Sequence, residues 1–131
     1  MTEFFLPMKR IPTATAQEKH HTVRGDKVVV YDPDAVKAAR AKFLSALTPH
    51  RPPAPYTGAV RLIVRWCFPC GKCHRDGEYK TTKPDTDNLL KLFKDCMTKV
   101  GFWKDDAQVA SELNEKFYAA VTGVYVQVTQ L

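Results

Sequence analysis

Long apolar runs are absent from the sequence. No stretch of the 131 residues approaches the roughly 20 consecutive apolar residues that a membrane-spanning helix needs, so we expect no membrane partner. The first ten residues, MTEFFLPMKR, carry an acid and a proline where a secretory signal has basic and then apolar residues. We therefore expect a cytoplasmic protein.

Cysteine is too scarce for a fold held by disulfide bonds. The chain has four cysteines, and a cytoplasmic location is expected to keep them reduced. With 44% hydrophobic and 26% charged residues, the composition is that of a globular protein, which argues against a disordered chain. A chain of this length buries about two-thirds of its unfolded surface without cross-links. We expect one domain spanning residues 1–131.

Acidic residues are outnumbered. The chain has 14 of them against 20 lysines and arginines, and the net charge of +6 favours an anionic partner such as nucleic acid. One stretch, KPDTDNLLKLFKDCMTKVGFWKDDAQV, nevertheless places Asp85 and Asp87 at the start of a predicted helix and Asp105 and Asp106 after it. A function for this protein has to explain why acids gather there in a basic chain.

Hydrophobic periodicity predicts an α+β fold. Alternation from Val60 to Phe68 is typical of a strand with one buried face, and helical spacing of apolar residues over 86–100 stops at Gly101. The other predicted elements are strands at 28–31, 113–121 and 124–128, a tight turn at 122–123, and a helix at 36–47 started by Asp32 and Pro33. We expect a small, mostly antiparallel or mixed sheet with helices packed against it.

Each acid of the stretch has an ordinary structural explanation. Asp85 stands where a helix N-cap belongs, and Asp87 could pair with Lys91 on the helix surface, a pair worth about 0.3–0.5 kcal/mol. Asp105 and Asp106 could form a surface turn. On this interpretation the protein is a non-catalytic junction-binding or DNA-binding module with structural acids.

A shared metal site explains the acids together. Pro84 helps to keep the preceding segment extended, so Asp85 outside the helix and Asp87 inside it can direct oxygens to one point. Mg²⁺ is bound by a few carboxylates together with water and substrate phosphate. Such an ion supports phosphodiester hydrolysis without a nucleophilic side chain. The surrounding cations would attract the DNA backbone, so this pattern predicts a DNA-cleaving metal site.

The same stretch resembles the RusA family of Holliday junction resolvases. The resemblance is carried by residues 83–91 (KPDTDNLLK), by Asp95, and by residues 101–109 (GFWKDDAQV). It implies a RusA-like two-layer fold and a homodimeric, Mg²⁺-dependent endodeoxyribonuclease, with Mn²⁺ as an alternative ion. The implied substrate is four-way junction DNA, nicked symmetrically without a small-molecule cofactor.

The resemblance also implies roles for individual residues. It places the metal ligands at Asp85, Asp87 and Asp106, with Lys91 as the catalytic or phosphate-positioning cation. Asn88 is expected to support the site or the helix start. Asp105 matches the family's other acid in that pair and ranks below Asp106.

The residues before the acids carry further cations. We expect 69–83 to form a loop whose basic side chains bind DNA phosphates beside the metal site: Lys72, Arg75, Lys80 and Lys83. The neighbouring sequence CFPCGKCH leaves an alternative open, a zinc site made by Cys67, Cys70, Cys73 and His74.

Chain geometry adds an expectation about subunits. A helix over 86–99 is about 21 Å long, and residues 101–106 reach back about 20 Å only if they are fully extended. A neighbouring subunit could supply Asp106 with less strain. We therefore predict a two-fold dimer in which each metal site joins Asp85 and Asp87 of one subunit to Asp106 of the other.

Overall fold

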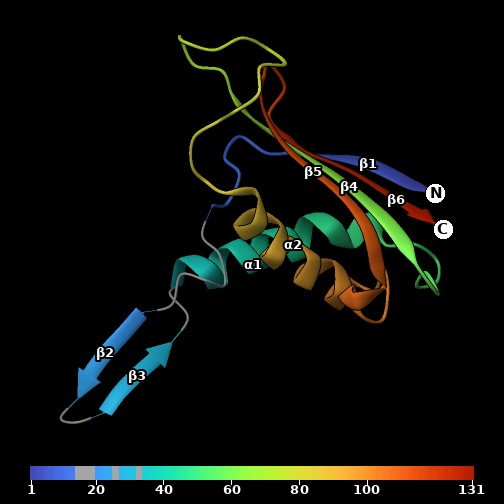
Figure 1. Ribbon diagram of the computed structural model, residues 1–131, viewed down its shortest axis with the longest axis horizontal. Helices are drawn as coiled ribbons and strands as arrows, with labels where there is room; N and C mark the ends of the chain where they lie inside the picture. Colours follow the sequence, from blue (N-terminus) through green and yellow to red (C-terminus); the bar gives the residue numbers. More distant parts are fainter. Residues whose placement is uncertain (14–19, 25–26, 32–33) are drawn as a thin grey trace.

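Two helices pack on one face of a mixed, four-stranded sheet (Figure 1). The structure, a computed structural model, describes residues 1–13, 20–24, 27–31 and 34–131, and it describes side chains outside residues 14–33. The strands are β1 (Thr2–Pro7), β2 (His20–Arg24), β3 (Lys27–Tyr31), β4 (Val60–Pro69), β5 (Val109–Ala119) and β6 (Gly123–Gln130). The helices are α1 (Asp34–Leu47) and α2 (Thr86–Val100), with short 3₁₀ helices η1 (Thr48–His50) and η2 (Asp106–Gln108). The predicted α+β class is confirmed.

Membrane crossing requires a helix that is both long and apolar. Within the described ranges no helix meets both conditions.

Strand β4 lies in the middle of the sheet, as its alternating sequence predicts. Every second side chain is buried: Val60, Leu62, Val64, Trp66 and Phe68. β4 pairs antiparallel with β6 and parallel with β5, in the strand order β1-β6-β4-β5. Parallel neighbours need a crossover connection, and α2 supplies it between β4 and β5. Both halves of the acidic stretch therefore belong to one β4–α2–β5 unit.

Aromatic side chains join both helices to β4. The rings of Phe43 on α1, Trp66 on β4 and Phe93 on α2 meet edge to face, with centroids 6.2, 5.1 and 5.2 Å apart. The indole N–H of Trp66 donates to Asn114 Oδ1 at 2.7 Å, so the buried indole has a partner. α2 ends where predicted, because Gly101 adopts the left-handed conformation with φ 107°.

The segment after α2 is packed into the core. Phe102 and Trp103 are 0% and 1% exposed, and the Trp103 indole N–H donates to Thr98 Oγ1 at 2.7 Å. This packing fixes the beginning of the segment that leads to Asp105 and Asp106.

Strand β5 forms where a strand is predicted, but its apolar side chains do not mark the covered face. Leu113 is 43% exposed, and Val121 lies beyond the end of the strand. The register with β4 instead places polar residues beside the buried Leu62, Val64 and Trp66, and these are Glu112, Asn114 and Lys116. The inner face of β5 therefore meets α2 through polar side chains.

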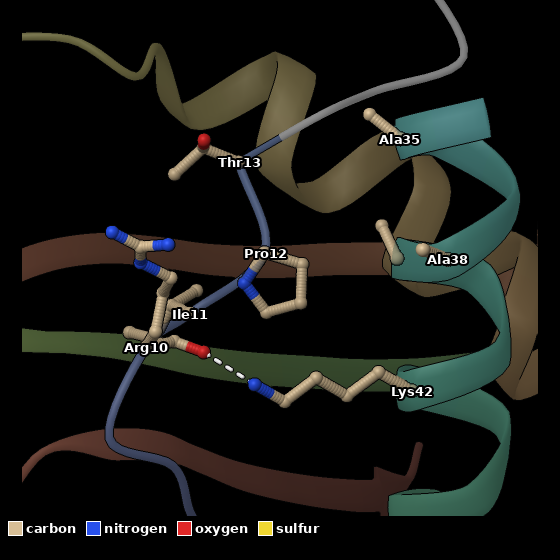
Figure 2. A pocket seen from close by; sticks show the side chains of 8 residues that line it. Arg10, Ile11, Pro12, Thr13, Ala35, Ala38 and Lys42 are labelled. Atoms are coloured by element: carbon tan, nitrogen blue, oxygen red, sulfur yellow. Dashed lines mark hydrogen bonds between the residues drawn. The ribbon is translucent and has the colours of Figure 1, made fainter. Parts of the chain in front are cut away.

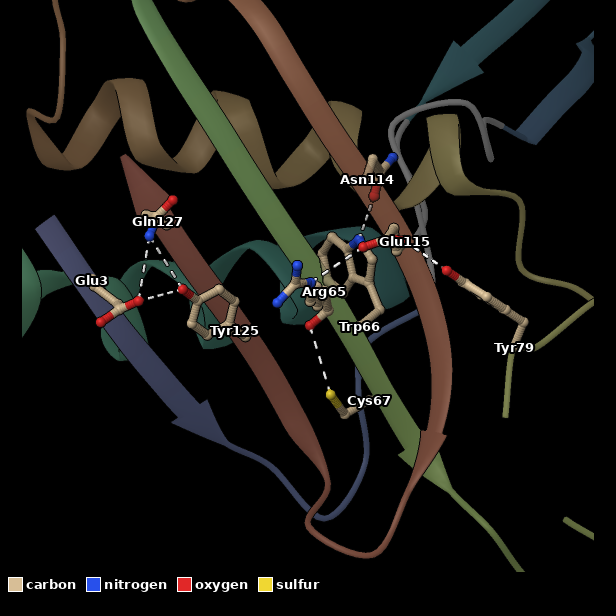
Figure 3. Close-up of polar contacts among 9 residues, drawn as sticks. All are labelled: Glu3, Arg65, Trp66, Cys67, Tyr79, Asn114, Glu115, Tyr125 and Gln127. Atoms are coloured by element: carbon tan, nitrogen blue, oxygen red, sulfur yellow. Dashed lines mark hydrogen bonds and ion pairs between the residues drawn. The ribbon is translucent and has the colours of Figure 1, made fainter. Parts of the chain in front are cut away.

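The opposite face of the sheet carries polar networks (Figure 3). Arg65 on β4 pairs with Glu115 on β5 at 3.2 Å, and Glu115 also accepts a hydrogen bond from the Tyr79 hydroxyl at 3.1 Å. Towards the β1 edge, the hydroxyl of Tyr125 donates to the carboxylate of Glu3. These contacts satisfy polar side chains on the side of the sheet that the helices do not cover.

The turn predicted at 122–123 leads into β6, whose Val124, Val126 and Val128 are all 0% exposed. The hairpin that such a turn implies does not form, because β4 lies between β5 and β6. β6 pairs with β4 and with β1, a strand that the sequence pattern does not predict.

The N-terminal third also matches the sequence in part. The strand predicted at 28–31 is β3, which pairs antiparallel with β2. The helix start predicted at Asp32 and Pro33 lies outside the described residues. α1 buries the predicted apolar positions, Val36, Ala39, Phe43 and Leu47.

The cysteines are predicted to differ in reactivity. Cys73 is exposed, whereas Cys96 on α2 is fully buried, and burial raises the pKa of its thiol to about 11. Since the thiolate is the reactive form, only about one Cys96 thiol in a thousand is ionised near pH 8. We expect Ellman's reagent to modify Cys73 in the native protein and Cys96 only after unfolding, as mass spectrometry of the modified peptides would show. Rapid native modification of Cys96 would contradict the packing of α2.

Candidate active site

Asp85 occupies the N-cap position of α2 without using its carboxylate as a cap. Its backbone is extended, at φ −73° and ψ 146°, and its carbonyl accepts from the Leu89 N–H at 3.2 Å. The carboxylate makes no capping hydrogen bond, so the cap interpretation is wrong for the side chain. Instead both oxygens accept from Lys83 Nζ, at 2.9 and 2.8 Å. This ammonium holds the pKa of the Asp85 carboxyl below its ordinary value, which keeps the group ionised.

Asp87 lies in the first turn of α2 and faces a hollow. The hollow has a volume of about 230 Å³ and is lined by Asp87, Leu90, Lys91, Lys94, Asp106 and Glu112. No ion pair within 4.0 Å joins Asp87 to Lys91, so the surface salt bridge that could explain both residues is not formed. Lys91 is exposed, and its ammonium has no carboxylate partner among the described residues.

Asp105 and Asp106 have different surroundings although they are adjacent. Asp105 caps η2, since its carboxylate accepts from the Ala107 N–H at 2.9 Å in a capping box completed by Gln108. The carboxylate of Asp106 accepts no hydrogen bond from any described residue and borders the hollow beside α2. Of the two acids, Asp106 is the one that borders this hollow together with Asp87 and Lys91.

Gln108 fixes the turn that carries these acids. Its Oε1 accepts from the backbone N–H groups of Lys104 and Asp105, at 3.1 and 3.2 Å. Its Nε2 donates to the carbonyls of Tyr56 and Gly58, both at 2.9 Å. One side-chain amide therefore ties the turn to the segment that precedes β4.

The structure brings some of the predicted site residues together, and not all of them. Asp87, Lys91 and Asp106 line the same hollow of one chain, whereas Asp85 does not line it. The described part of a single chain contains no group of three Asp, Glu, His or Cys side chains arranged to bind a metal ion.

The acidic stretch lies within a region that matches a known protein family. A family model described as "Endodeoxyribonuclease RusA" matches residues 10–129, which include β4, α2, η2 and β5. The chain belongs to the RusA family.

Two relatives span most of the chain. An "Uncharacterized protein YqaN" of Bacillus subtilis (strain 168) is 30% identical over 121 residues, which cover 84% of each chain. A protein of Lactococcus phage r1t, "Crossover junction endodeoxyribonuclease rusA", is 26% identical over 131 residues, which cover 98% of each chain. The resemblance stated from the sequence is therefore confirmed at the level of the RusA family.

Strand β5 contributes to the hollow one residue that lies outside the motif of the RusA family. Glu112 lines it, and its carboxylate accepts from Lys94 Nζ at 3.0 Å. The available signal is the alternation of β5 itself, in which Glu112, Asn114 and Lys116 share one face. A strand whose polar face is covered by a helix indicates a site or an interface at that face.

Two of the four loop cations expected to bind DNA have partners within the chain. Lys83 pairs with Asp85, and the ammonium of Lys80 lies 4.9 Å from the ring centroid of Tyr118. Lys72 and Arg75 are exposed to solvent. Of these four cations, Lys83 is placed beside Asp85 by its ion pair.

The zinc alternative requires four side chains to converge: Cys67, Cys70, Cys73 and His74. Cys67 lies on the face of the sheet opposite the helices, where its Sγ is 3.9 Å from the Arg65 carbonyl (Figure 3). The His74 ring stacks on Tyr118 at 3.7 Å, and its Nδ1 lies 2.8 Å from a Glu78 oxygen. These four side chains, all within the described part of the chain, do not form a group arranged to bind a metal ion.

Another hollow lies elsewhere. It has a volume of about 550 Å³ and lies between α1 and the segment after β1, where Lys42 Nζ donates to the Arg10 carbonyl at 2.6 Å (Figure 2). The described residues that line it include two cations and several apolar side chains, and none of these described residues is acidic.

Lys91 is predicted to matter for rate and not for stability. Lys91→Ala should slow junction nicking by about 10²–10³-fold, because a cation facing a phosphate stabilises charge in the transition state. The melting temperature should stay close to that of the wild type, since an exposed lysine without an ion pair contributes little to stability. Lys37→Ala, at an exposed lysine of helix α1, is the matched control and should keep its activity. Parallel losses of stability and rate in Lys91→Ala would favour a structural role.

Proposed function

We propose that this protein is a metal-dependent endodeoxyribonuclease that resolves Holliday junctions by paired, symmetric phosphodiester hydrolysis. One observation carries the proposal: Asp87, Lys91 and Asp106, from both halves of the motif, line one hollow beside α2. Membership of the RusA family supports the same substrate class, as does the name of the phage relative. Under this proposal residues 1–131 act as one nuclease domain.

The carboxylates of the proposed site suit a hard divalent cation. Asp85, Asp87 and Asp106 offer oxygen ligands that are exposed or half-buried, which leaves room for water and for substrate phosphate. We assign these three as ligands for Mg²⁺, with Mn²⁺ as an alternative ion, and no small-molecule cofactor. When bound, the ion would polarise a phosphoryl oxygen and lower the pKa of a bound water.

The chain's own side chains then have separable tasks. The Lys91 ammonium neutralises charge on the phosphate that enters the hollow. Lys72, Arg75, Lys80 and Lys83 contact the DNA backbone beside it, which orients the junction without reading its sequence. Asn88 supports the start of α2, and Asp105 fixes the turn that presents Asp106.

A homodimer completes the proposal. Paired cuts in a four-way junction need two sites related by symmetry, and a two-fold dimer supplies them. Such a dimer could also bring Asp106 of one subunit to Asp85 and Asp87 of its partner. Within a chain, Asp87 and Asp106 border one hollow, which weakens the case from chain length for this arrangement.

The decisive experiment compares a labelled four-way junction with a linear duplex of matching sequence. With Mg²⁺ we expect one nick in each of two opposed strands of the junction and an intact duplex. Chelation of the metal ion should stop nicking and leave binding in place. Junction binding that is insensitive to Mg²⁺ and never accompanied by nicks would overturn the proposal in favour of a non-catalytic binding module.

A further inference from the structure

Two side chains of β5 hold the segment that carries Asp85. Lys116 Nζ donates to the carbonyls of Thr82 and Pro84, both at 2.7 Å. Asn114 Nδ2 donates to the carbonyl of Thr86 at 2.8 Å. The three carbonyls belong to every second residue, and the last two flank Asp85 directly.

The spacing explains why one strand can make all three contacts. Side chains on one face of a strand recur every two residues, about 6.7 Å apart, so Asn114 and Lys116 face the segment before α2 together. Asp85 itself has extended backbone angles. Backbone contact adds to the match, because the Lys80 N–H donates to the Lys116 carbonyl at 3.0 Å. The segment 80–86 and β5 therefore lie side by side.

The inner end of this arrangement is anchored in the core. Asn114 Oδ1 accepts from the indole N–H of Trp66 at 2.7 Å, and Trp66 is 0% exposed. Trp66 also packs edge to face against Phe93 of α2. The side-chain amide of Asn114 thus connects the Thr86 carbonyl to the buried indole of Trp66 in the core. Lys116 is half-buried, and its ammonium makes charge-assisted hydrogen bonds, which are stronger than neutral ones.

We infer that Lys116 and Asn114 are positioning residues for the metal site: they fix the backbone on both sides of Asp85 so that its carboxylate and that of Asp87 are presented in a constant geometry. The inference rests on the proposed function, and neither residue is assigned a contact with DNA or metal. Groups that orient metal ligands commonly change metal affinity when they are replaced.

The test uses Lys116→Met, which keeps the length of the side chain and removes its charge and its donors. Mn²⁺ binding to the protein alone, measured by electron paramagnetic resonance, should weaken by about 10-fold or more. The Mg²⁺ concentration for half-maximal nicking should rise by a similar factor, while junction binding without metal stays unchanged. Lys116→Arg, which keeps donors and charge, should recover part of the affinity.

Lys37→Met is the matched control, since it removes the charge of one exposed lysine on α1 and should leave Mn²⁺ binding unchanged. Removing a cation near Asp85 would, by charge alone, strengthen metal binding. Unchanged or tighter Mn²⁺ binding in Lys116→Met would therefore overturn the inference. If that variant melts below the assay temperature, Lys116→Gln, which keeps a donor, replaces it and should show a smaller loss in the same direction.

The two proposals fail separately. A wild-type protein that does not nick junctions overturns the proposed function. Weakened Mn²⁺ binding in Lys116→Met but not in Lys37→Met would still support positioning in that case. A nicking wild type with unaltered Mn²⁺ binding in Lys116→Met supports the nuclease and overturns the positioning role.

Discussion

Asp87→Asn is expected to abolish junction cleavage while the protein stays folded and still binds junctions. Asp87 is exposed in the first turn of α2 and has no ion-pair partner among the described residues. Its loss removes only the favourable contact of a carboxylate with the helix N-terminus, about 0.3–1 kcal/mol. The rate should fall by about 10³-fold, because charge is removed from the proposed metal site. Junction affinity should stay equal or increase, since one negative charge facing phosphate is gone.

Gel assays of nicking and binding, together with a thermal melt, measure these three quantities. Asp34→Asn is the matched control, because Asp34 also lies in the first turn of a helix, α1, and is not among the proposed site residues. It should show the same small change in melting temperature and full nicking activity. Cleavage by Asp87→Asn at nearly the wild-type rate would contradict the assignment of Asp87 as a metal ligand.

A mixed dimer of Asp87→Asn and Asp106→Asn chains is expected to regain single nicks, although each parent dimer is inactive. Asp87 and Asp106 border one hollow within a chain, but Asp85 does not, and no three-ligand cluster forms within the described part of one chain. If each site joins Asp85 and Asp87 of one subunit to Asp106 of its partner, the mixed dimer retains one complete site. A single site should cut one strand and leave the second uncut.

The control is a mixed dimer of Asp87→Asn with Asp105→Asn. Asparagine can replace aspartate as a cap of η2, so this dimer should nick one strand whichever chain supplies Asp106. Nicking by this control shows that the subunits have mixed and that a dimer with one intact site is active. If this control nicks and the Asp106→Asn mixture binds junctions without nicking, the three carboxylates belong to one chain.

Strand β4 and helix α2 could be predicted in full because each has one apolar face that the core covers. From Val60 to Phe68 every second side chain is apolar and buried, and on α2 the buried Leu89, Phe93 and Met97 repeat at helical spacing. The family of the chain could also be read from its motif, since PD-x-DN and DD-x-QV place several residue types at fixed spacing.

Strand β5 shows what periodicity cannot supply. Its alternation is present, but Leu113 and Phe117 lie on the uncovered face, and the polar set that includes Asn114 faces α2. Which face of an edge strand is covered depends on the position of a helix, and that position is set by contacts distant in sequence. The pairing of β6 with β1 and β4 depends on such contacts in the same way.

The acids illustrate a second limit. Asp105 and Asp106 are identical in type and adjacent in sequence, and only hydrogen bonds separate the cap from the candidate ligand. Asp85 has an N-cap position that would suit a capping carboxylate, yet its side chain pairs with Lys83. Side-chain direction at such positions follows from backbone angles and neighbours, which residue type alone does not determine.

The hydrogen bond between Trp66 and Asn114 gives the molecule an internal spectroscopic reporter. The same amide contacts the Thr86 carbonyl at the start of α2, so a shift of that backbone alters the environment of a buried indole. Trp103, the second tryptophan, is bonded to Thr98 near the other end of the helix. In a Trp103→Phe protein, fluorescence would therefore follow the acid-bearing end of α2 alone, without an attached dye.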